Sequence, residues 1–272
     1  MRDHATAWGV AIEGVTETEH SVLAFGHRED QRVTLKLFKQ RDEEILAGRV
    51  LRAFAGNSTV RILDQVQGVL LLERLIPGES LVTMAASGHD ENATEVLASV
   101  IGRLSPAACP GVPTIEQWGK SFERYQAGDD QPLPTRLVAD AHQLYLDLCS
   151  SQRYRRLLHG DLHHGNVLHD SERGWVAIDP KGVLGEPEYE IGAALRNPIE
   201  HPEVFLEPRT IEGRLSCLAD RLQLNADRVL GWAFAQAVLA AVWLREDGVA
   251  VSDDHPWLAL ARIMQPMLKR RR

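Results

Sequence analysis

A change of pattern near residue 77 constrains the fold of this 272-residue chain more than any other feature. Before it, short apolar or alternating runs are separated by turn residues, a pattern that predicts strands. The runs read WGVAI, HSVLAFG, RVTLKLF, TVRIL and GVLLLERL. After Pro77-Gly78 the apolar spacing becomes helical. We therefore expect a strand-rich part over residues 1–75 and a mainly helical part over residues 76–272.

One helix interrupts the strand-rich part. Residues 42–55 read DEEILAGRVLRAFA, with apolar residues near helical spacing after an acidic first turn. In the second part, helices are predicted at 90–104, 114–127, 136–151, 208–223, 225–246 and 255–268. Two short strands, 166–169 and 175–178, lie between the third and fourth of these helices. The chain is therefore predicted to be α+β, with a small antiparallel sheet and one helix in the N-terminal lobe and a larger helical C-terminal lobe.

Charge and cysteine usage restrict the class of protein. A net charge of −8 argues against a general nucleic-acid binder and is compatible with a small cationic substrate. Cys109, Cys149 and Cys217 are odd in number and form no CxxC pair, which is typical of reduced thiols. The N-terminus does not read as a secretory signal, and the apolar run 229–244 is shorter than the roughly 20 residues of a membrane span. We expect a cytoplasmic monomer or weak homodimer without membrane contact.

The segment HGDLHHGN, residues 159–166, and the later IDPKG, residues 178–182, carry the clearest chemical signal. Transfer of the terminal phosphoryl group of ATP requires a carboxylate at the acceptor hydroxyl, hard oxygen ligands for magnesium and a lysine on the phosphates. Asp161, Asn166 and Asp179 have the order and spacing that kinase-like enzymes use. Lys36 in VTLKLF and Glu44 in the first helix are candidates for a lysine–glutamate pair.

Other interpretations of the same residues exist. The four histidines of residues 159–169, with Asp161 and Asp170, are also a candidate zinc or di-metal cluster, although their order differs from His-x-His-x-Asp-His. Asp161 and Asn166 alone would suit a turn, because both residue types favour turns. Lys36 and Glu44, taken singly, would be ordinary surface residues. The argument for phosphoryl transfer rests on the whole set.

The sequence resembles the aminoglycoside phosphotransferase branch of the protein-kinase-like fold, within it the streptomycin and hydroxyurea phosphotransferases. The resemblance rests on HGDLHHGN, on WVAIDPKGVLGEPEYEIGAALRNP and on EPRTIEGRLSCLADRLQLNADRVLGWAFAQAVLAAVW. It implies a bilobal protein-kinase-like fold that uses ATP and magnesium. It also implies residue roles: Asp161 as the catalytic aspartate, Asn166 and Asp179 as magnesium ligands, Lys36 on the α and β phosphates with Glu44 as its partner, and the backbone from Glu73 to Leu75 as the adenine hinge.

Two departures from the family pattern stand out. The phosphate-covering turn near residues 16–21 contains no glycine. The metal loop reads Asp179-Pro180-Lys181, so the phenylalanine switch of regulated protein kinases is not expected.

The acidic stretch after the metal loop suggests how a cationic acceptor would be held. Glu186 and Glu190 are the candidates nearest to that loop. Three functions remain open from the sequence. The first is a phosphotransferase for streptomycin or a related aminoglycoside. The second is a kinase for a sugar, amino sugar or hydroxyurea-like metabolite. The third is a non-catalytic nucleotide-binding relative.

Overall fold

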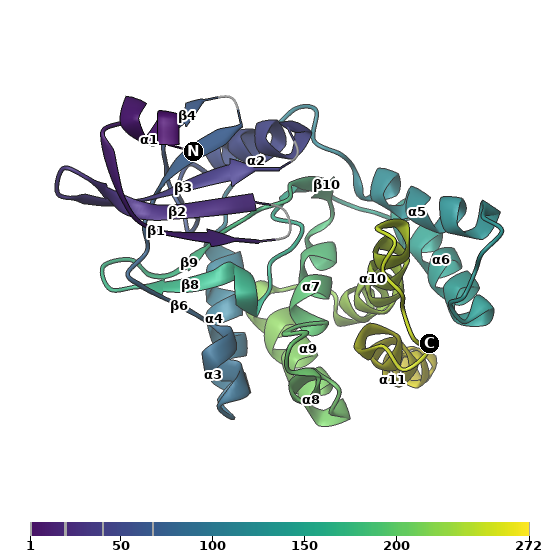
Figure 1. Ribbon diagram of the computed structural model, residues 1–272. Coiled ribbons are helices and arrows are strands. Elements are labelled where there is room, and N and C mark those ends of the chain that lie inside the picture. Colours follow the sequence, from purple (N-terminus) through teal and green to yellow (C-terminus); the bar gives the residue numbers. More distant parts are fainter. Residues whose placement is uncertain (1, 19–20, 40, 67, 272) are drawn as a thin grey trace.

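An antiparallel sheet of five strands forms the N-terminal lobe of the computed structural model (Figure 1). The elements of this lobe are α1 (Arg2–Ala7), β1 (Val10–Glu17), β2 (Ser21–Arg28), β3 (Gln31–Phe38), α2 (Arg41–Phe54), β4 (Ile62–Val66) and β5 (Val69–Glu73). The spatial order is β1-β2-β3-β5-β4, so α2 lies in the connection between β3 and β4. The structure describes residues 2–18, 21–39, 41–66 and 68–271, without the side chains of 41–45 and 271.

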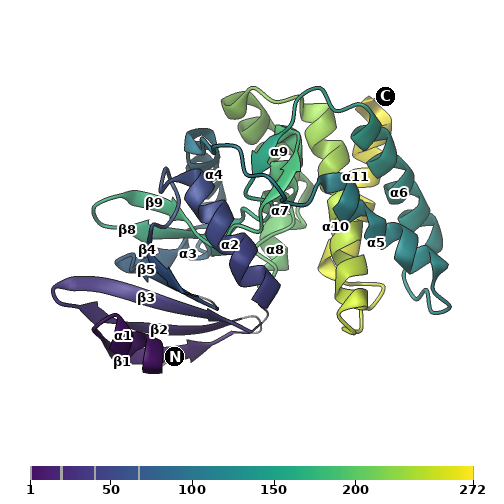
Figure 2. The ribbon, with the colours of Figure 1, turned by 90° about the horizontal axis from the view of Figure 1, so that it is seen from above.

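Alternation along the central strands divides their side chains between two faces of the sheet. Leu35 of β3 packs with Leu71 of β5 on the face that α1 covers. Leu70 points the other way and packs against Leu51 of α2. Lys36 follows Leu35 and is the register partner of Leu70, so it lies on the same face as α2. That face is turned toward the second lobe, with α2 between the sheet and the helices (Figure 2).

Two small sheets connect the lobes. One contains β6 (Pro77–Ser80), β8 (Val167–Asp170) and β9 (Gly174–Ala177), and the other pairs β7 (Arg156–Leu158) with β10 (Val183–Gly185). The β8–β9 hairpin lies beneath the five-stranded sheet in Figure 1. Because the loops that leave β7 and β9 carry the predicted site residues, these short strands fix the site between the lobes.

The C-terminal lobe is mainly helical. Its α-helices are α3 (Val82–Ala86), α4 (Asp90–Arg103), α5 (Ile115–Ala127), α6 (Thr135–Ser150), α7 (Ile191–Leu195), α8 (Pro202–Phe205), α9 (Pro208–Leu222), α10 (Ala226–Glu246) and α11 (Pro256–Arg271). Within the described chain, α10 alone is long and apolar enough to cross a membrane by length and composition. Its residues 229–242 are all buried, and it packs against α5, α6, α7 and α11. It is therefore the core helix of this lobe, and its bounds agree with the helix predicted at 225–246.

The predicted bilobal α+β architecture is confirmed, and two strands of the N-terminal lobe differ from their predicted bounds. β1 extends past the predicted run WGVAI to Glu17, through a bulge that shifts the register between Ile12 and Gly14. The predicted strand at 59–63 begins only at Ile62, and Thr59 instead forms an isolated bridge to Ala177 of β9.

Candidate active site

The loop that follows β7 brings Asp161 to the space between the lobes. Gly160 has a φ of +84°, in the left-handed region that favours glycine, and a Cβ there would lie 2.8 Å from the ring of Trp118. The carboxylate of Glu190 accepts hydrogen bonds from the backbone N–H of His159 at 2.7 Å and of Gly160 at 3.0 Å. These contacts fix the backbone immediately before Asp161.

His159 is fully buried and holds this loop against the metal loop. Its Nε2 donates to the carbonyl oxygen of Ile178 at 2.9 Å, and its Nδ1 accepts from the backbone N–H of Asp161 at 3.3 Å. Burial lowers the pKa of His159 to about 4, although the nearby Asp161 carboxylate acts in the opposite direction. The ring is therefore neutral, and its two contacts fix one tautomer.

The carboxylate of Asp161 remains partly open, with 26% of its side chain exposed. Its Oδ1 lies 3.3 Å from a guanidinium nitrogen of Arg196, and its Oδ2 lies 3.9 Å from Nε2 of His163. Arg196 is itself held by Gln236 at 3.1 Å. Asp161 is thus oriented from one side and open on another, as a carboxylate that receives an acceptor proton must be.

Asn166 links the two loops of the site. Its Nδ2 donates to the carbonyl oxygen of Asp161 at 2.8 Å, and its own carbonyl oxygen accepts from the N–H of Ile178 at 2.9 Å. Its Oδ1 has no hydrogen-bond partner among the described residues, so this oxygen remains available to a metal ion.

Asp179 follows β9 with a φ of +57°, a conformation that aspartate tolerates better than most residues. Its Oδ1 accepts from Nζ of Lys36 at 2.5 Å. Burial raises the pKa of Asp179, but Lys36 and Lys181 outweigh that effect and hold the pKa below its ordinary value. Asp179 is therefore an ionised carboxylate near neutral pH, and 33% of its side chain is exposed.

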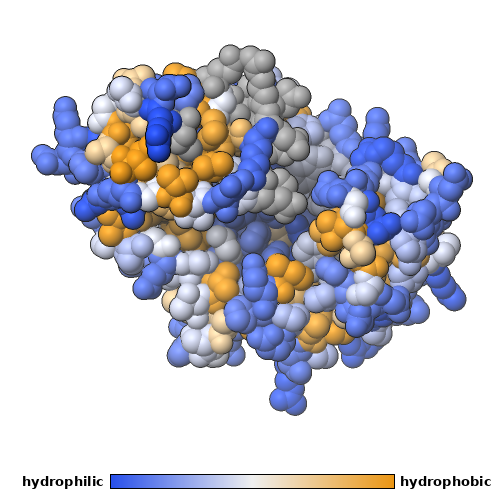
Figure 3. Space-filling view, viewed as in Figure 1, coloured by the Kyte–Doolittle hydropathy of each residue, from blue (hydrophilic) through white to orange (hydrophobic). Residues whose placement is uncertain are grey.

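A cavity of about 580 Å³ lies between the lobes and contains both Lys36 and Asp179 in its lining. Figure 3 shows the surface hollowed between the sheet and the helical lobe. The other lining residues include apolar side chains of β2, β3 and β5 and the segment from Glu73 to Leu75. The lining therefore suits a nucleotide: its apolar residues can pack against a flat ring, and the ammonium group of Lys36 can contact phosphates.

Residues 8–248 match the family described as aminoglycoside/hydroxyurea antibiotic resistance kinase. The chain belongs to this family. It is 32% identical over 249 residues to streptomycin 3''-kinase of Klebsiella pneumoniae, covering 89% of this chain and 91% of that protein. It is 30% identical over 261 residues to streptomycin 6-kinase of Streptomyces glaucescens, covering 90% and 82%.

A solved structure supports the fold independently of close sequence identity. A thermostable mutant of aminoglycoside phosphotransferase APH(4)-Ia, in a ternary complex with AMP-PNP and hygromycin B, superposes with a TM-score of 0.68 at 16% identity. The match covers 99% of this chain and 97% of the other. The family resemblance and the kinase-like fold predicted from the motifs are thus confirmed, and the chain is a kinase that transfers phosphoryl groups to hydroxyl groups.

The structure does not bring every predicted residue of this kinase to the open site. Glu186 is 2% exposed, accepts from Arg228 at 2.6 Å and accepts also from Trp232. Glu190 is also 2% exposed and is bonded to the catalytic loop. Both carboxylates already have protein partners, so the predicted contact with an acceptor is corrected to a structural role for each.

Three other predictions concern the nucleotide side. Lys36 pairs with Asp179, whereas its expected partner Glu44 lies in α2 among the side chains outside the described part. Leu75 is buried in the cavity wall, and its backbone N–H has no partner among the described residues. The phosphate-covering turn includes Glu19 and His20, which lie outside the described residues.

The histidines of residues 159–169 make separate contacts in the structure. No group of three or more His, Cys, Asp or Glu side chains in the described chain is arranged to hold a metal ion. His163 accepts from the N–H of Gly165 at 3.1 Å, while His169 packs edge-on against Trp175. His164 is fully buried, and neither of its ring nitrogens has a hydrogen-bond partner among the described residues. The arrangement of a histidine zinc site is not present among these residues.

Arg196 is the site residue whose contact the sequence did not place. The Arg196 side chain is buried within the lobe, and its guanidinium group reaches Asp161. Its separation of 35 residues from Asp161 leaves no local signal for that contact.

Proposed function

We propose that this kinase transfers the γ-phosphoryl group of ATP to a hydroxyl group of a cationic aminoglycoside, with streptomycin the first candidate. The observation that carries the proposal is the geometry of the loops. The Asn166 amide donates to the carbonyl oxygen of Asp161, and the carbonyl oxygen of Asn166 accepts from the N–H of Ile178, the residue before Asp179. Asp179 in turn pairs with Lys36 in the wall of the cavity. The relatives named streptomycin kinases supply the acceptor class.

The residues at this site also fit a magnesium ion. Asn166 Oδ1 and the Asp179 carboxylate are hard oxygen donors, and the lowered pKa of Asp179 keeps it ionised. When bound, magnesium would neutralise charge that develops on the phosphates. Lys36 would contact the phosphate oxygens from the sheet side. Asp161 would orient the acceptor hydroxyl and accept its proton, with Arg196 holding the carboxylate in place.

These positions suggest a separate function for each lobe. We assign residues 1–75 to nucleotide binding, with backbone groups of Glu73 and Leu75 contacting adenine, and residues 76–272 to catalysis and acceptor binding. Because such an enzyme needs ATP, we propose a cytoplasmic location for it.

We propose that a carboxylate other than Glu186 or Glu190 contacts the positive charge of the acceptor. Glu200 is exposed and lies close enough to His163 to act on it electrostatically. His163 in turn lies beside Asp161. Glu200 is therefore our candidate for contact with a cationic group of the acceptor.

The test is phosphate transfer from labelled ATP with magnesium to a panel of streptomycin, other aminoglycosides, simple sugars, choline and hydroxyurea. Labelled streptomycin is the expected product, and mapping the label distinguishes the 3'' from the 6 position. The Asp161→Ala variant should lose about 10²-fold or more in kcat while its affinity for ATP changes little.

Asp147→Ala is a matched control, because Asp147 is an exposed aspartate on α6. Retained turnover in Asp161→Ala would refute the role of Asp161. Label on a sugar, choline or hydroxyurea alone would replace the acceptor and leave the kinase assignment intact. ATP binding with no transfer to any acceptor would favour the non-catalytic alternative.

A further inference from the structure

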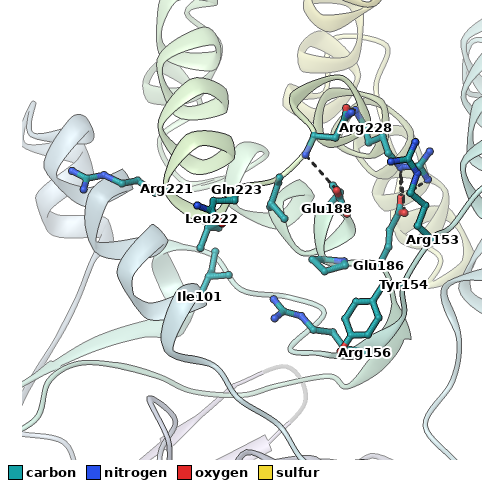
Figure 4. Close-up of a pocket in the computed structure, with 14 residues that line it drawn as sticks. Ile101, Arg153, Tyr154, Arg156, Glu186, Glu188, Arg221, Leu222, Gln223 and Arg228 are labelled. Carbon is teal, nitrogen blue, oxygen red and sulfur yellow. Dashed lines mark hydrogen bonds and ion pairs between the residues drawn. The ribbon is translucent and has the colours of Figure 1, made fainter.

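A second hollow, of about 520 Å³, lies in the C-terminal lobe (Figure 4). Its walls come from the ends of α4 and α9, the start of α10 and the segment that leads into β7. Arg153, Tyr154 and Arg156 stand on one side of it, and Ile101 and Leu222 on another (Figure 4). It shares no lining residue with the nucleotide cavity, so it is a separate site.

Arginine dominates the charge of this hollow. Of four arginines in the lining, Arg228 is paired with Glu186 at 2.6 Å and Arg221 with Glu95 at 2.8 Å. Arg156 pairs with Gly185 through its backbone in the β7–β10 ladder. The guanidinium groups of Arg153 and Arg156 have no hydrogen-bond or ion-pair partner in the part of the chain that the structure describes. An excess of positive charge in a concave site is unexpected in a chain with a net charge of −8.

Glu188, the remaining acidic residue of the lining, is already engaged. Its carboxylate accepts from the N–H of Asn225 at 3.3 Å, and Figure 4 draws this bond at the back of the hollow. Asn225 is the N-cap of α10 and accepts from the N–H of Arg228 at 3.0 Å. The positive end of a 21-residue helix therefore faces the same space.

The apolar part of the lining complements the charge. The ring of Tyr154 is 65% exposed, which is unusual for an aromatic side chain at the rim of a cavity and leaves its face open to a ligand. Tyr154 lies between the two free arginines in the sequence and beside Arg156 in Figure 4. Ile101 and Leu222 add apolar surface on the other side.

We propose that this hollow binds a small molecule that carries a phosphate group. The guanidinium groups of Arg153 and Arg156 contact the phosphate, because guanidinium matches phosphate in charge and in hydrogen-bond geometry. Tyr154 contacts a ring or other apolar part of the ligand. The volume suits a small molecule, and the overall negative charge of the chain disfavours a long polyanion.

Calorimetric titration of the full chain with inorganic phosphate and with phenyl phosphate tests this proposal, in chloride-balanced buffer of constant ionic strength. Arg153→Gln and Arg156→Gln should each weaken phosphate binding by about tenfold or more, because each change removes a charge-assisted hydrogen bond to the phosphate. Arg153 is exposed, so its variant is expected to fold even if that of Arg156 does not.

Arg155→Gln is the matched control. It removes the same charge from the neighbouring position, but Arg155 is bonded to Glu116 and does not line the hollow. Its affinity for phosphate should equal that of the unaltered chain. Lys36→Met should also retain the binding, which separates this hollow from the nucleotide cavity.

The two probes distinguish the sources of phosphate. Tighter binding of phenyl phosphate, lost in Tyr154→Ala, identifies an organic phosphate monoester, while equal affinities identify inorganic phosphate. The proposal fails if the unaltered chain binds neither probe. It also fails if the Arg153 and Arg156 variants bind as Arg155→Gln does, or if Lys36→Met abolishes the binding.

Discussion

Lys36 lies on the sheet face toward the second lobe, because side chains alternate between the two faces along β3. Its ammonium group pairs with Asp179, and 13% of the Lys36 side chain is exposed. Lys36→Met retains most of the aliphatic stem and removes the charge that would stabilise the phosphates. We expect kcat/KM for ATP to fall by about 10²-fold, the scale reported for loss of one preorganised donor.

Steady-state kinetics at saturating acceptor measures this effect. Lys120→Met is the control, since Lys120 is an exposed lysine on α5 that does not line the cavity. If both variants lost the same factor, Lys36 would have no special role at the phosphates.

Glu190 gives a prediction about pH and stability. Burial raises its pKa to about 7, although the N–H groups of Gly160 and His159 pull in the other direction. Between pH 4.5 and 7 the unfolded chain ionises this group while the folded chain retains the proton. The unfolded state therefore binds fewer protons, and the contribution of Glu190 to stability falls as pH rises through this window.

The expected loss is about 3 kcal/mol, at roughly 1.4 kcal/mol for each unit of pKa difference. Urea unfolding at a series of pH values measures it, with Glu190→Gln as the comparison. The free energy of unfolding of the variant, relative to the unaltered chain, should improve from pH 4.5 to 7. A constant difference would show that Glu190 is ionised throughout.

At the scale of elements, Gly182 sets how closely α2 approaches the metal loop. Gly182 has a φ of +76°, and a Cβ there would lie 2.2 Å from Cγ2 of Val50 in α2. Gly182→Ala should therefore destabilise the chain by about 1–3 kcal/mol through backbone strain and overpacking. Gly174→Ala, with a φ of +69° and open space around its Cβ, isolates the backbone contribution.

A double-mutant cycle with Val50→Ala tests the steric explanation. Val50→Ala alone should cost stability, because Val50 is fully buried. Combined with Gly182→Ala, it should cost less than the sum of the two single changes. Additive losses, measured by urea unfolding, would mean that the close approach to Val50 does not limit this position.

Some helices and strands could be predicted from the sequence, and others could not. Long helices such as α9 and α10 and the β8–β9 hairpin were predicted because periodicity and turn residues are local signals. β7 and β10 have three residues each, too few to show an alternating pattern. α7 is buried on all sides, so it has no polar face to reveal helical spacing.

The positions of some site residues could likewise be predicted from the sequence, whereas the partners of others could not. The spacing of Asp161, Asn166 and Asp179 is carried by one loop and one hairpin, so the sequence could place them together. The partners of Glu186 and Glu190 depend on how distant segments pack, with Glu186 and Arg228 separated by 42 residues. From the sequence, the negative charge of Glu186 and Glu190 and their closeness to the metal loop suggested contacts with an acceptor. In the folded chain, packing instead pairs both carboxylates with groups of the protein itself.

At the scale of the whole molecule, the lobes are joined by polar contacts as well as by the chain. Arg173, in the turn between β8 and β9, reaches the Glu73 carboxylate and donates to the carbonyl oxygens of Gly56 at 2.8 Å and Thr59 at 3.1 Å. Asp170 accepts from the N–H of Ile76 at 3.0 Å. These contacts hold the segment from Glu73 to Ile76 against the C-terminal lobe, so the cavity between the lobes has a defined wall.

The charge of the whole molecule predicts how salt affects the reaction. A net charge of −8 attracts a cationic acceptor over a distance set by the Debye length, about 30 Å at 0.01 M and about 8 Å at 0.15 M salt. With ATP and magnesium saturating, kcat/KM for streptomycin should fall by about tenfold as salt rises over this range. The change should lie in KM, because phosphoryl transfer takes place after the acceptor is bound. Steady-state rates with Glu200→Gln should show a shallower dependence, and a neutral acceptor should show none. An equal response for charged and neutral acceptors would mean that salt acts on the enzyme and not on the attraction.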